Sequence, residues 1–244
     1  MPSNNTISRE IANIMRDEIL RKRYRSGDRL PSERDLAARF DASRGAVREA
    51  LSQLEQLGLI HIQPGGARVQ SVDSASLAVL GPLLALDDHP DSLLVDQFLQ
   101  TFSVLTSMTA KNAVNAASPD QLIQLKELVV ALEGHFNDFE EMQPRWRELL
   151  DAMSIIADNL VVRLISNDLK TQFVDQMMKL GVRPDLKEGS IDKLLETLKV
   201  SLNKQDGELA SKAMQNHFEK VREGVGEAIR FKAASLRNKR YGEA

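Results

Sequence analysis

The sequence predicts a mainly α-helical protein: a small N-terminal winged helix-turn-helix domain followed by an all-helical antiparallel bundle. Three observations lead to this fold class. Apolar residues recur at helical spacing over most of the chain, one strand-turn-strand pattern falls at 59–72, and the charge balance changes after it. Residues 1–72 carry 12 Lys and Arg against 9 Asp and Glu, whereas the remainder carries 20 against 26. A basic module attached to an acidic body indicates two domains.

The composition excludes several classes of protein. The chain has 244 residues, of which 42% are hydrophobic and 27% charged, a globular balance. Without cysteine it has no disulfide framework, thiolate zinc site or cysteine nucleophile. The first nine residues lack the apolar core of a signal peptide, and the longest nearly uncharged stretch, 74–86, is too short to span a bilayer. We therefore expect a cytoplasmic protein with no membrane partner.

Capping and periodicity predict the elements of the first domain, residues 1–72. A first helix is expected over 7–24 and ends before Ser26-Gly27-Asp28. Ser32 is a good N-cap for a second helix over 33–40, with Asp35 in a capping-box-like position. Ser43 caps a third helix that runs to Leu57. Strands are then expected over 59–63 and 67–72, joined by Pro64-Gly65-Gly66, which completes a winged helix-turn-helix plan.

The rest of the chain reads as helix. Residues 73–90 are predicted to be a linker with a possible short helix over 75–86, and residues 91–244 an effector-binding and dimerisation domain of about six helices. The expected breaks between these helices fall at 118–119, 137–144, 166–168, 181–184 with 189–190, and 205–207.

The third predicted helix carries positive charge at its start. Recognition helices read the major groove with their N-terminal residues, a role that suits Arg44 and Arg48, which lie four residues apart on one face. The small residues Gly45 and Ala46 allow a close approach to DNA, and Arg34 of the second helix could join them. The alternative is that these arginines are solvated or paired with neighbouring carboxylates.

The motif residues closely resemble the GntR superfamily of bacterial transcriptional regulators. The resemblance spans about 40 residues and rests on Leu30-Pro31-Ser32-Glu33-Arg34-Asp35-Leu36-Ala37, Ser43-Arg44, Val47-Arg48-Glu49-Ala50-Leu51, Leu54-Glu55 and Gly58-Leu59-Ile60. It implies operator contacts by Arg34, Arg44 and Arg48, and a wing tip that enters the minor groove. The usual wing, Gln-Gly-Arg-Gly-Thr, is replaced here by Gln63-Pro64-Gly65-Gly66-Ala67, so Arg68 could substitute for the lost arginine. The expected DNA-contacting set is Arg34, Ser43, Arg44, Gly45, Ala46, Arg48, Gly65 and Gly66.

The C-terminal part is similar to the FCD ligand-binding domain of the FadR subfamily. Most FCD domains hold a divalent metal, but here the first ligand positions fall on Trp146 and Leu150, the next near Leu195, and only His217 is retained. We therefore expect no metal and no other cofactor. The resulting apolar interior resembles that of the fatty-acid-responsive branch of the subfamily and implies a fatty acyl-CoA-like effector. The candidate effector residues are Phe98, Phe102, Leu105, Trp146, Leu150, Met153, Leu195 and His217.

The sequence thus predicts a ligand-responsive transcriptional regulator, not an enzyme, that binds a palindromic DNA operator as a homodimer. Several alternatives stay open. One alternative is that the Phe and Met side chains are ordinary core. Another is that the domain has lost its ligand and serves only for dimerisation. A third is that the effector is a small organic acid. The alternative from another class is an enzyme-like or metal-binding domain fused to a DNA-binding module.

Overall fold

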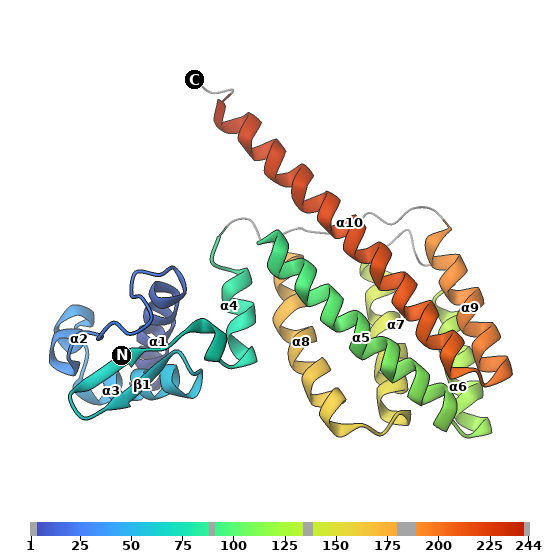
Figure 1. Cartoon of the computed structure of the whole chain (residues 1–244), viewed down its shortest axis with the longest axis horizontal. Coiled ribbons are helices and arrows are strands. Elements are labelled where there is room, and N and C mark those ends of the chain that lie inside the picture. Colours follow the sequence, from blue (N-terminus) through green and yellow to red (C-terminus); the bar gives the residue numbers. More distant parts are fainter. Residues whose placement is uncertain (1–3, 88–90, 134–138, 180–188, 242–244) are drawn as a thin grey trace. The chain divides into compact units, whose positions relative to one another are not determined.

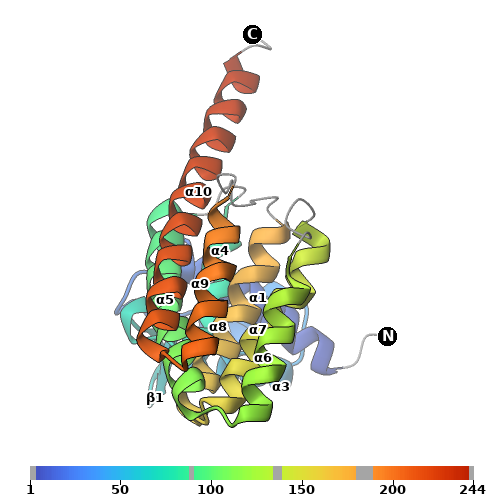
Figure 2. The same cartoon turned by 90° about the vertical axis from the view of Figure 1, so that its right-hand side faces the viewer.

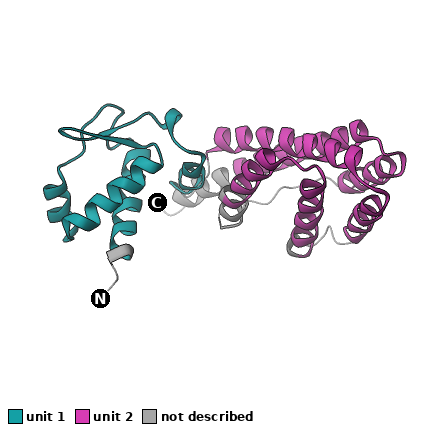
Figure 3. Ribbon diagram, turned by 90° about the horizontal axis from the view of Figure 1, so that it is seen from below, with its two compact units in different colours: residues 1–88 teal, residues 89–244 magenta. Residues whose placement is uncertain are grey.

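The computed structural model describes residues 4–87, 91–133, 139–179 and 189–241. The chain divides into two compact units, Met1–Asp88 and His89–Ala244 (Figure 3). In agreement with the predicted fold class, the described residues are mostly helical, and a small two-stranded sheet follows the N-terminal helices. None of the described helices is long and apolar enough to cross a membrane.

Unit 1 begins with three helices, α1 (Asn4–Leu20), α2 (Glu33–Phe40) and α3 (Arg44–Gln56). The helix α1 packs on α3, and their apolar faces enclose Met15, Leu36 and Leu54, each with no exposed surface. The first helix ends earlier than the sequence predicted. Lys22 takes a left-handed φ of 60°, and Arg23 N donates to the Glu18 carbonyl at 2.9 Å, so the helix closes without a glycine.

The wing is an antiparallel hairpin of β1 (Ile60–Gln63) and β2 (Gly66–Val69). Ile60 pairs with Val69 and Gln63 with Gly66, so two residues form the turn. Gly58, which separates α3 from β1, has a φ of 71°, and a Cβ there would lie 2.9 Å from the Ser74 carbonyl oxygen. Only glycine suits this position, since any side chain would be strained and would strike the main chain of the following segment.

The predicted linker packs against unit 1. It contains the short helices η1 (Val72–Ser74), η2 (Leu77–Val79) and α4 (Leu80–Leu84). Val79 is 5% exposed and belongs to the core of unit 1, and Leu83 and Leu86 pack on the same core. Arg21 and Asp87 form an ion pair at 3.0 Å. Apolar burial therefore keeps this segment with the first unit.

Unit 2 is a helical bundle formed by six helices among the residues that the structure describes (Figure 1). These are α5 (Ser92–Ala116), α6 (Pro119–Ala131), α7 (Phe139–Ile156), α8 (Leu160–Lys179), α9 (Ser190–Lys204) and α10 (Gly207–Tyr241). The helices run roughly along a common direction, which is close to vertical in Figure 2.

The antiparallel pair of α5 and α10 forms the longest contact of the bundle. Arg222 binds Asp96 through two hydrogen bonds of 2.8 and 3.2 Å near one end of the pair. Gly207 N donates to Asn115 Oδ1 at 3.1 Å near the other end. These contacts fix the register of the two helices along their shared length.

One expected helix break is wrong, and part of a second lies inside a helix. The segment 166–168 lies inside α8, where Ser166 and Leu169 continue the buried face begun by Val162. Packing of that face outweighs the low helix propensity of Ser, Asn and Asp. The expected break at 137–144 lies partly outside the described residues, and Pro144 is inside α7, exposed near its beginning.

The actual break between α7 and α8 was missed at 157–159. Asp158 has a left-handed φ of 48°, and Asn159 Oδ1 accepts a hydrogen bond from Val162 N at 3.1 Å. Asp and Asn are residues that favour such positions, so the signal was present in the sequence.

Candidate nucleic-acid interface and effector site

The turn between α2 and α3 presents the start of α3 to the solvent. Asp41 has a left-handed φ of 47° and ends α2. Ser43 Oγ accepts a hydrogen bond from Ala46 N at 3.1 Å, as its predicted N-cap role requires. One face of α3 is then buried, including Val47 and Ala50, which leaves Arg44 and Arg48 exposed.

The three candidate arginines differ in their partners. Arg48 Nε donates to Glu33 Oε2 at 2.7 Å, and Arg34 Nε lies 3.7 Å from Asp35. Arg44 forms no ion pair with any residue that the structure describes. The pairing of Arg48 joins α2 to α3, with side chains 69% and 39% exposed. An exposed pair contributes at most about 1 kcal/mol, so it can open for another acceptor.

One member of the expected DNA-contacting set has a different position. The side chain of Ala46 has no exposed surface, because it belongs to the apolar face of α3. Its methyl group is therefore part of the core and is not offered to DNA. Gly45 is exposed, and a Cβ there would meet only its neighbour Ser43 Oγ, at 3.7 Å.

The tip of the wing has no charged side chain of its own. Gly65 and Gly66 are exposed, with φ values of 102° and 121°. Arg68 extends away from the tip and donates through Nη1 to the Gly27 carbonyl at 2.9 Å. The residue that lies against Gly66 is Arg29, which our sequence reasoning missed. The only feature of the sequence that could have indicated a role for Arg29 is its position just before Leu30-Pro31, which lead into α2.

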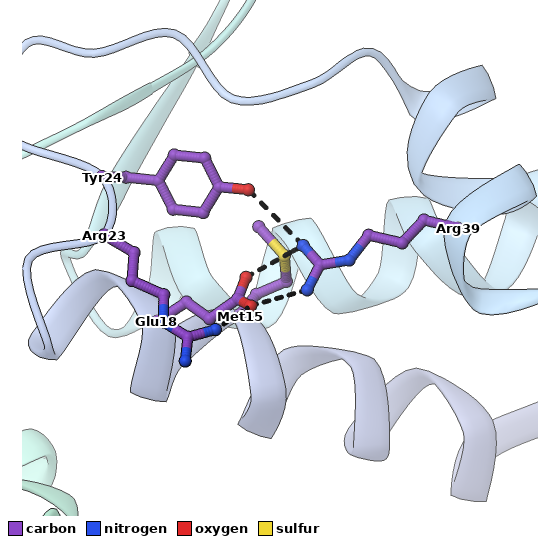
Figure 4. A network of polar contacts seen from close by, with 5 residues as sticks. All are labelled: Met15, Glu18, Arg23, Tyr24 and Arg39. Carbon is purple, nitrogen blue, oxygen red and sulfur yellow. Dashed lines mark hydrogen bonds and ion pairs between the residues drawn. The ribbon is translucent and has the colours of Figure 1, made fainter.

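Unit 1 also contains a partly buried ion-pair network between α1 and α2, which Figure 4 shows. Glu18, 7% exposed, accepts from Arg39 at 2.6 and 2.9 Å and from Arg23 at 3.1 Å. The hydrogen bond from Arg39 is the main reason that the pKa of Glu18 is lowered, and the carboxylate likewise raises the pKa of Arg39. The network fixes α2 on α1 and thereby sets where α3 lies.

The candidate effector residues lie mostly in the interior of unit 2. Phe98, Phe102, Met153 and Leu195 are at most 6% exposed, and Leu150 is 8% exposed, whereas Leu105 and Trp146 are half-buried. Ring contacts connect part of the set. Phe98 stacks on Phe102 at 5.7 Å between ring centroids, and Trp146 lies 5.1 Å from His217. Phe218, which was not predicted, contacts both Phe102 and His217.

His217 is a buried and uncharged polar residue. Burial lowers its pKa to about 4, with a smaller contribution from Lys220. Its Nδ1 has no hydrogen-bond partner, and neither does the buried Ser107 Oγ of α5, among the residues described. One imidazole with Trp146 beside it does not fit a metal site, and in the described parts of the chain no three His, Asp or Glu side chains are grouped so that they could hold a metal ion.

A separate open groove of about 640 Å³ lies between α6 and α7 and contains none of the candidate effector residues. Its walls mix apolar and charged side chains, among them Leu128, Arg147 and Asp151. The groove therefore supplies no support for the effector site expected from the sequence.

Comparison with known proteins defines the first unit. Residues 7–69 match the model of the bacterial regulatory proteins of the gntR family. Together with the capped α2–turn–α3 arrangement and the wing, this match makes unit 1 a GntR-family DNA-binding helix-turn-helix domain.

Curated relatives extend the similarity beyond that domain. The chain is 31% identical over 149 residues to the fatty acid metabolism regulator protein of Haemophilus influenzae (strain 86-028NP), covering 60% of each chain. It thus spans 60% of the length of that relative. It is 26% identical over 225 residues to the transcriptional repressor NanR of Citrobacter rodentium, covering 88% of this chain and 84% of NanR.

A solved structure shares the fold. This protein, Lar, is described as controlling expression of the Listeria monocytogenes agr system, and it superposes with a TM-score of 0.54 at 18% identity. The match covers 89% of this chain and 95% of Lar.

Proposed function

We propose that the chain is a transcriptional regulator, and not an enzyme, that binds double-stranded operator DNA through α3 and the wing. The observation that carries this proposal is the exposed arginine face of α3 within a GntR-family domain. Arg44 and Arg48 extend from the first turns of a helix whose opposite face is buried. Arginine at such a position recognises guanine through two hydrogen bonds in the major groove.

The operator is palindromic and the protein binds it as a homodimer. One recognition helix reads only a few base pairs, so a single domain has limited specificity. Two-fold symmetry places two copies of α3 on matching half-sites about one helical turn apart. The Arg48–Glu33 pair opens on binding, because the exposed carboxylate is a weak competitor for a guanine or phosphate acceptor.

Arg44→Ala tests this assignment. We expect binding to the operator to weaken by about 1–3 kcal/mol, with lost discrimination at one base position of each half-site. The operator is first recovered by in vitro selection from a random duplex pool, and affinities are then measured by fluorescence anisotropy. Gln56→Ala, at the exposed far end of α3, is the matched control. Unchanged affinity and sequence preference in Arg44→Ala would refute the proposed DNA-reading face.

We further propose that unit 2 is an FCD-like domain that binds an apolar acyl effector without a metal. Two observations support this. Aromatic and aliphatic side chains occupy the positions that the resemblance assigns to metal ligands, and a curated relative is a fatty acid metabolism regulator. A long acyl chain would replace contacts among these apolar side chains, and its burial is favourable by about 0.8 kcal/mol per methylene.

A small organic acid is the second candidate effector. It is favoured by one observation, namely that His217 Nδ1 and Ser107 Oγ are both buried and find no hydrogen-bond partner among the residues that the structure describes. Buried polar groups are nearly always hydrogen-bonded, so a carboxylate or hydroxyl of a ligand is a suitable partner for them.

A further inference from the structure

The wing has a third extended segment at its edge. Leu30 N donates to the Ala67 carbonyl, and Gly27 N to the Val69 carbonyl, both at 2.9 Å. Arg29 and Arg68 face each other in an antiparallel bridge between this segment and β2. The segment that precedes α2 is therefore attached to the wing by main-chain hydrogen bonds, and a side chain at position 29 is held beside the hairpin.

The Arg29 side chain extends along the wing to its tip. A Cβ on Gly66 would lie 3.1 Å from Arg29 Nε and 3.3 Å from Nη2. The guanidinium thus occupies the space that a side chain of residue 66 would need. Glycine at position 66, with a φ of 121°, both permits this main-chain conformation and leaves room for the arginine.

The charge at this edge is not neutralised by any residue that the structure describes. Arg68 donates to the Gly27 carbonyl, which is an uncharged acceptor. The nearby Asp28 carboxylate accepts from Arg25 N at 2.6 Å within its own turn. No carboxylate of the described residues forms an ion pair with Arg29 or Arg68. Two exposed cationic side chains therefore start from paired residues of the wing, with Arg29 directed toward Gly66 and Arg68 toward Gly27.

We propose that Arg29, with Arg68 beside it, is the wing's contact with the DNA phosphates that flank the operator half-site. The proposal rests on the DNA-binding function proposed above. A guanidinium forms two parallel hydrogen bonds with a phosphate, and each phosphate neutralised releases counterions. Arg29 thus supplies from outside the hairpin the positive charge that the sequence Gln63-Pro64-Gly65-Gly66-Ala67 lacks.

Arg29→Ala in the full-length protein tests this contact. We measure anisotropy with two fluorescein-labelled 30-base-pair duplexes, the selected operator and a scrambled sequence, at a series of KCl concentrations. Loss of one phosphate contact should weaken binding to both duplexes by a similar factor, about 3- to 10-fold, and lower the salt slope of log K by about 1 for each bound chain. Arg29→Lys keeps the charge and should restore most of the slope. Lys193→Ala, exposed on α9, controls for net charge.

The outcomes separate this inference from the function on which it rests. If Arg44→Ala weakens operator binding but Arg29→Ala leaves affinity and salt slope unchanged, the phosphate contact is refuted and the function stands. A loss limited to A·T-rich flanks, with an unchanged slope, assigns Arg29 to base edges in the minor groove and also overturns the proposal. If neither duplex binds the wild-type protein, the proposed function itself fails. An unchanged thermal unfolding midpoint in Arg29→Ala confirms that folding is not the cause.

Discussion

At the residue scale, His217 shows how burial determines the chemistry of a side chain. The resemblance to FCD domains implies a metal ligand at this histidine, but the structure places Trp146 and Phe218 against it. Removal from water disfavours the imidazolium and lowers its pKa to about 4. At neutral pH the residue is therefore an uncharged donor and acceptor inside an apolar bundle, available to a polar group of a ligand.

The buried His217 predicts acid sensitivity of unit 2. Its folded-state pKa of about 4 lies below the usual histidine pKa of 6.5, so the unfolded chain binds the proton first as pH falls. Stability is then lost between pH 6.5 and pH 4, by up to about 3 kcal/mol. We expect urea unfolding followed by circular dichroism to show this slope in the wild type and a shallower one in His217→Leu. Parallel pH profiles of the two proteins would contradict it.

At the element scale, the Glu18–Arg39 network determines how α2 packs on α1. Arg39 extends over the Phe40 ring, 4.7 Å from its centroid, and its fork matches the Glu18 carboxylate (Figure 4). Two of the three helices of the DNA-binding unit are thus joined by a charged contact at the edge of the apolar core. Loss of the Glu18–Arg39 contact would change the position of α2 on α1 and, through the short turn at Asp41, the direction of α3.

Glu18→Gln should destabilise unit 1 by about 1–3 kcal/mol, because it removes charge-assisted hydrogen bonds and leaves Arg39 without its carboxylate. Asp17→Asn is the matched control, since its neighbouring pair with Arg16 is more exposed and should contribute under about 1 kcal/mol. Since the pKa of Glu18 is lowered, the difference between wild type and Glu18→Gln should be present above about pH 4.5 and disappear at lower pH. Equal urea midpoints for both variants at pH 7 would contradict this role.

Local signals predicted the elements of unit 1 better than those of unit 2. Ser32 and Ser43 cap their helices as expected, because an N-cap depends on residues within three positions. By contrast, the continuity of α8 through Ser166 depends on burial against other helices, and no local pattern reports that burial. The role of Arg29 was not predicted for the same reason. Its neighbour Gly66 is remote in sequence, and the two residues come together only when the edge of the sheet forms.

At the scale of the whole molecule, the proposed regulator requires that an event in unit 2 change DNA binding by unit 1. Two compact units joined by one connection can be coupled only if the effector favours one arrangement of the dimer over another. The required coupling is small, since a fiftyfold change in operator affinity corresponds to about 2 kcal/mol. Linkage is reciprocal, so the operator must change the affinity for the effector by the same factor.

The chain offers a direct probe of this linkage, because its single tryptophan, Trp146, lies 5.1 Å from His217 among the candidate effector residues. We expect palmitoyl-CoA to change Trp146 fluorescence and to shift operator affinity, and operator DNA to shift the dissociation constant of palmitoyl-CoA by an equal factor. Coenzyme A without its acyl chain is the control. A response to small dicarboxylates alone would instead favour the second candidate effector, a small organic acid. Its polar groups would bind His217 Nδ1 and Ser107 Oγ. If palmitoyl-CoA binds but operator affinity is unchanged, the proposed regulatory coupling is refuted, because a ligand that binds both arrangements of the dimer equally cannot shift their populations.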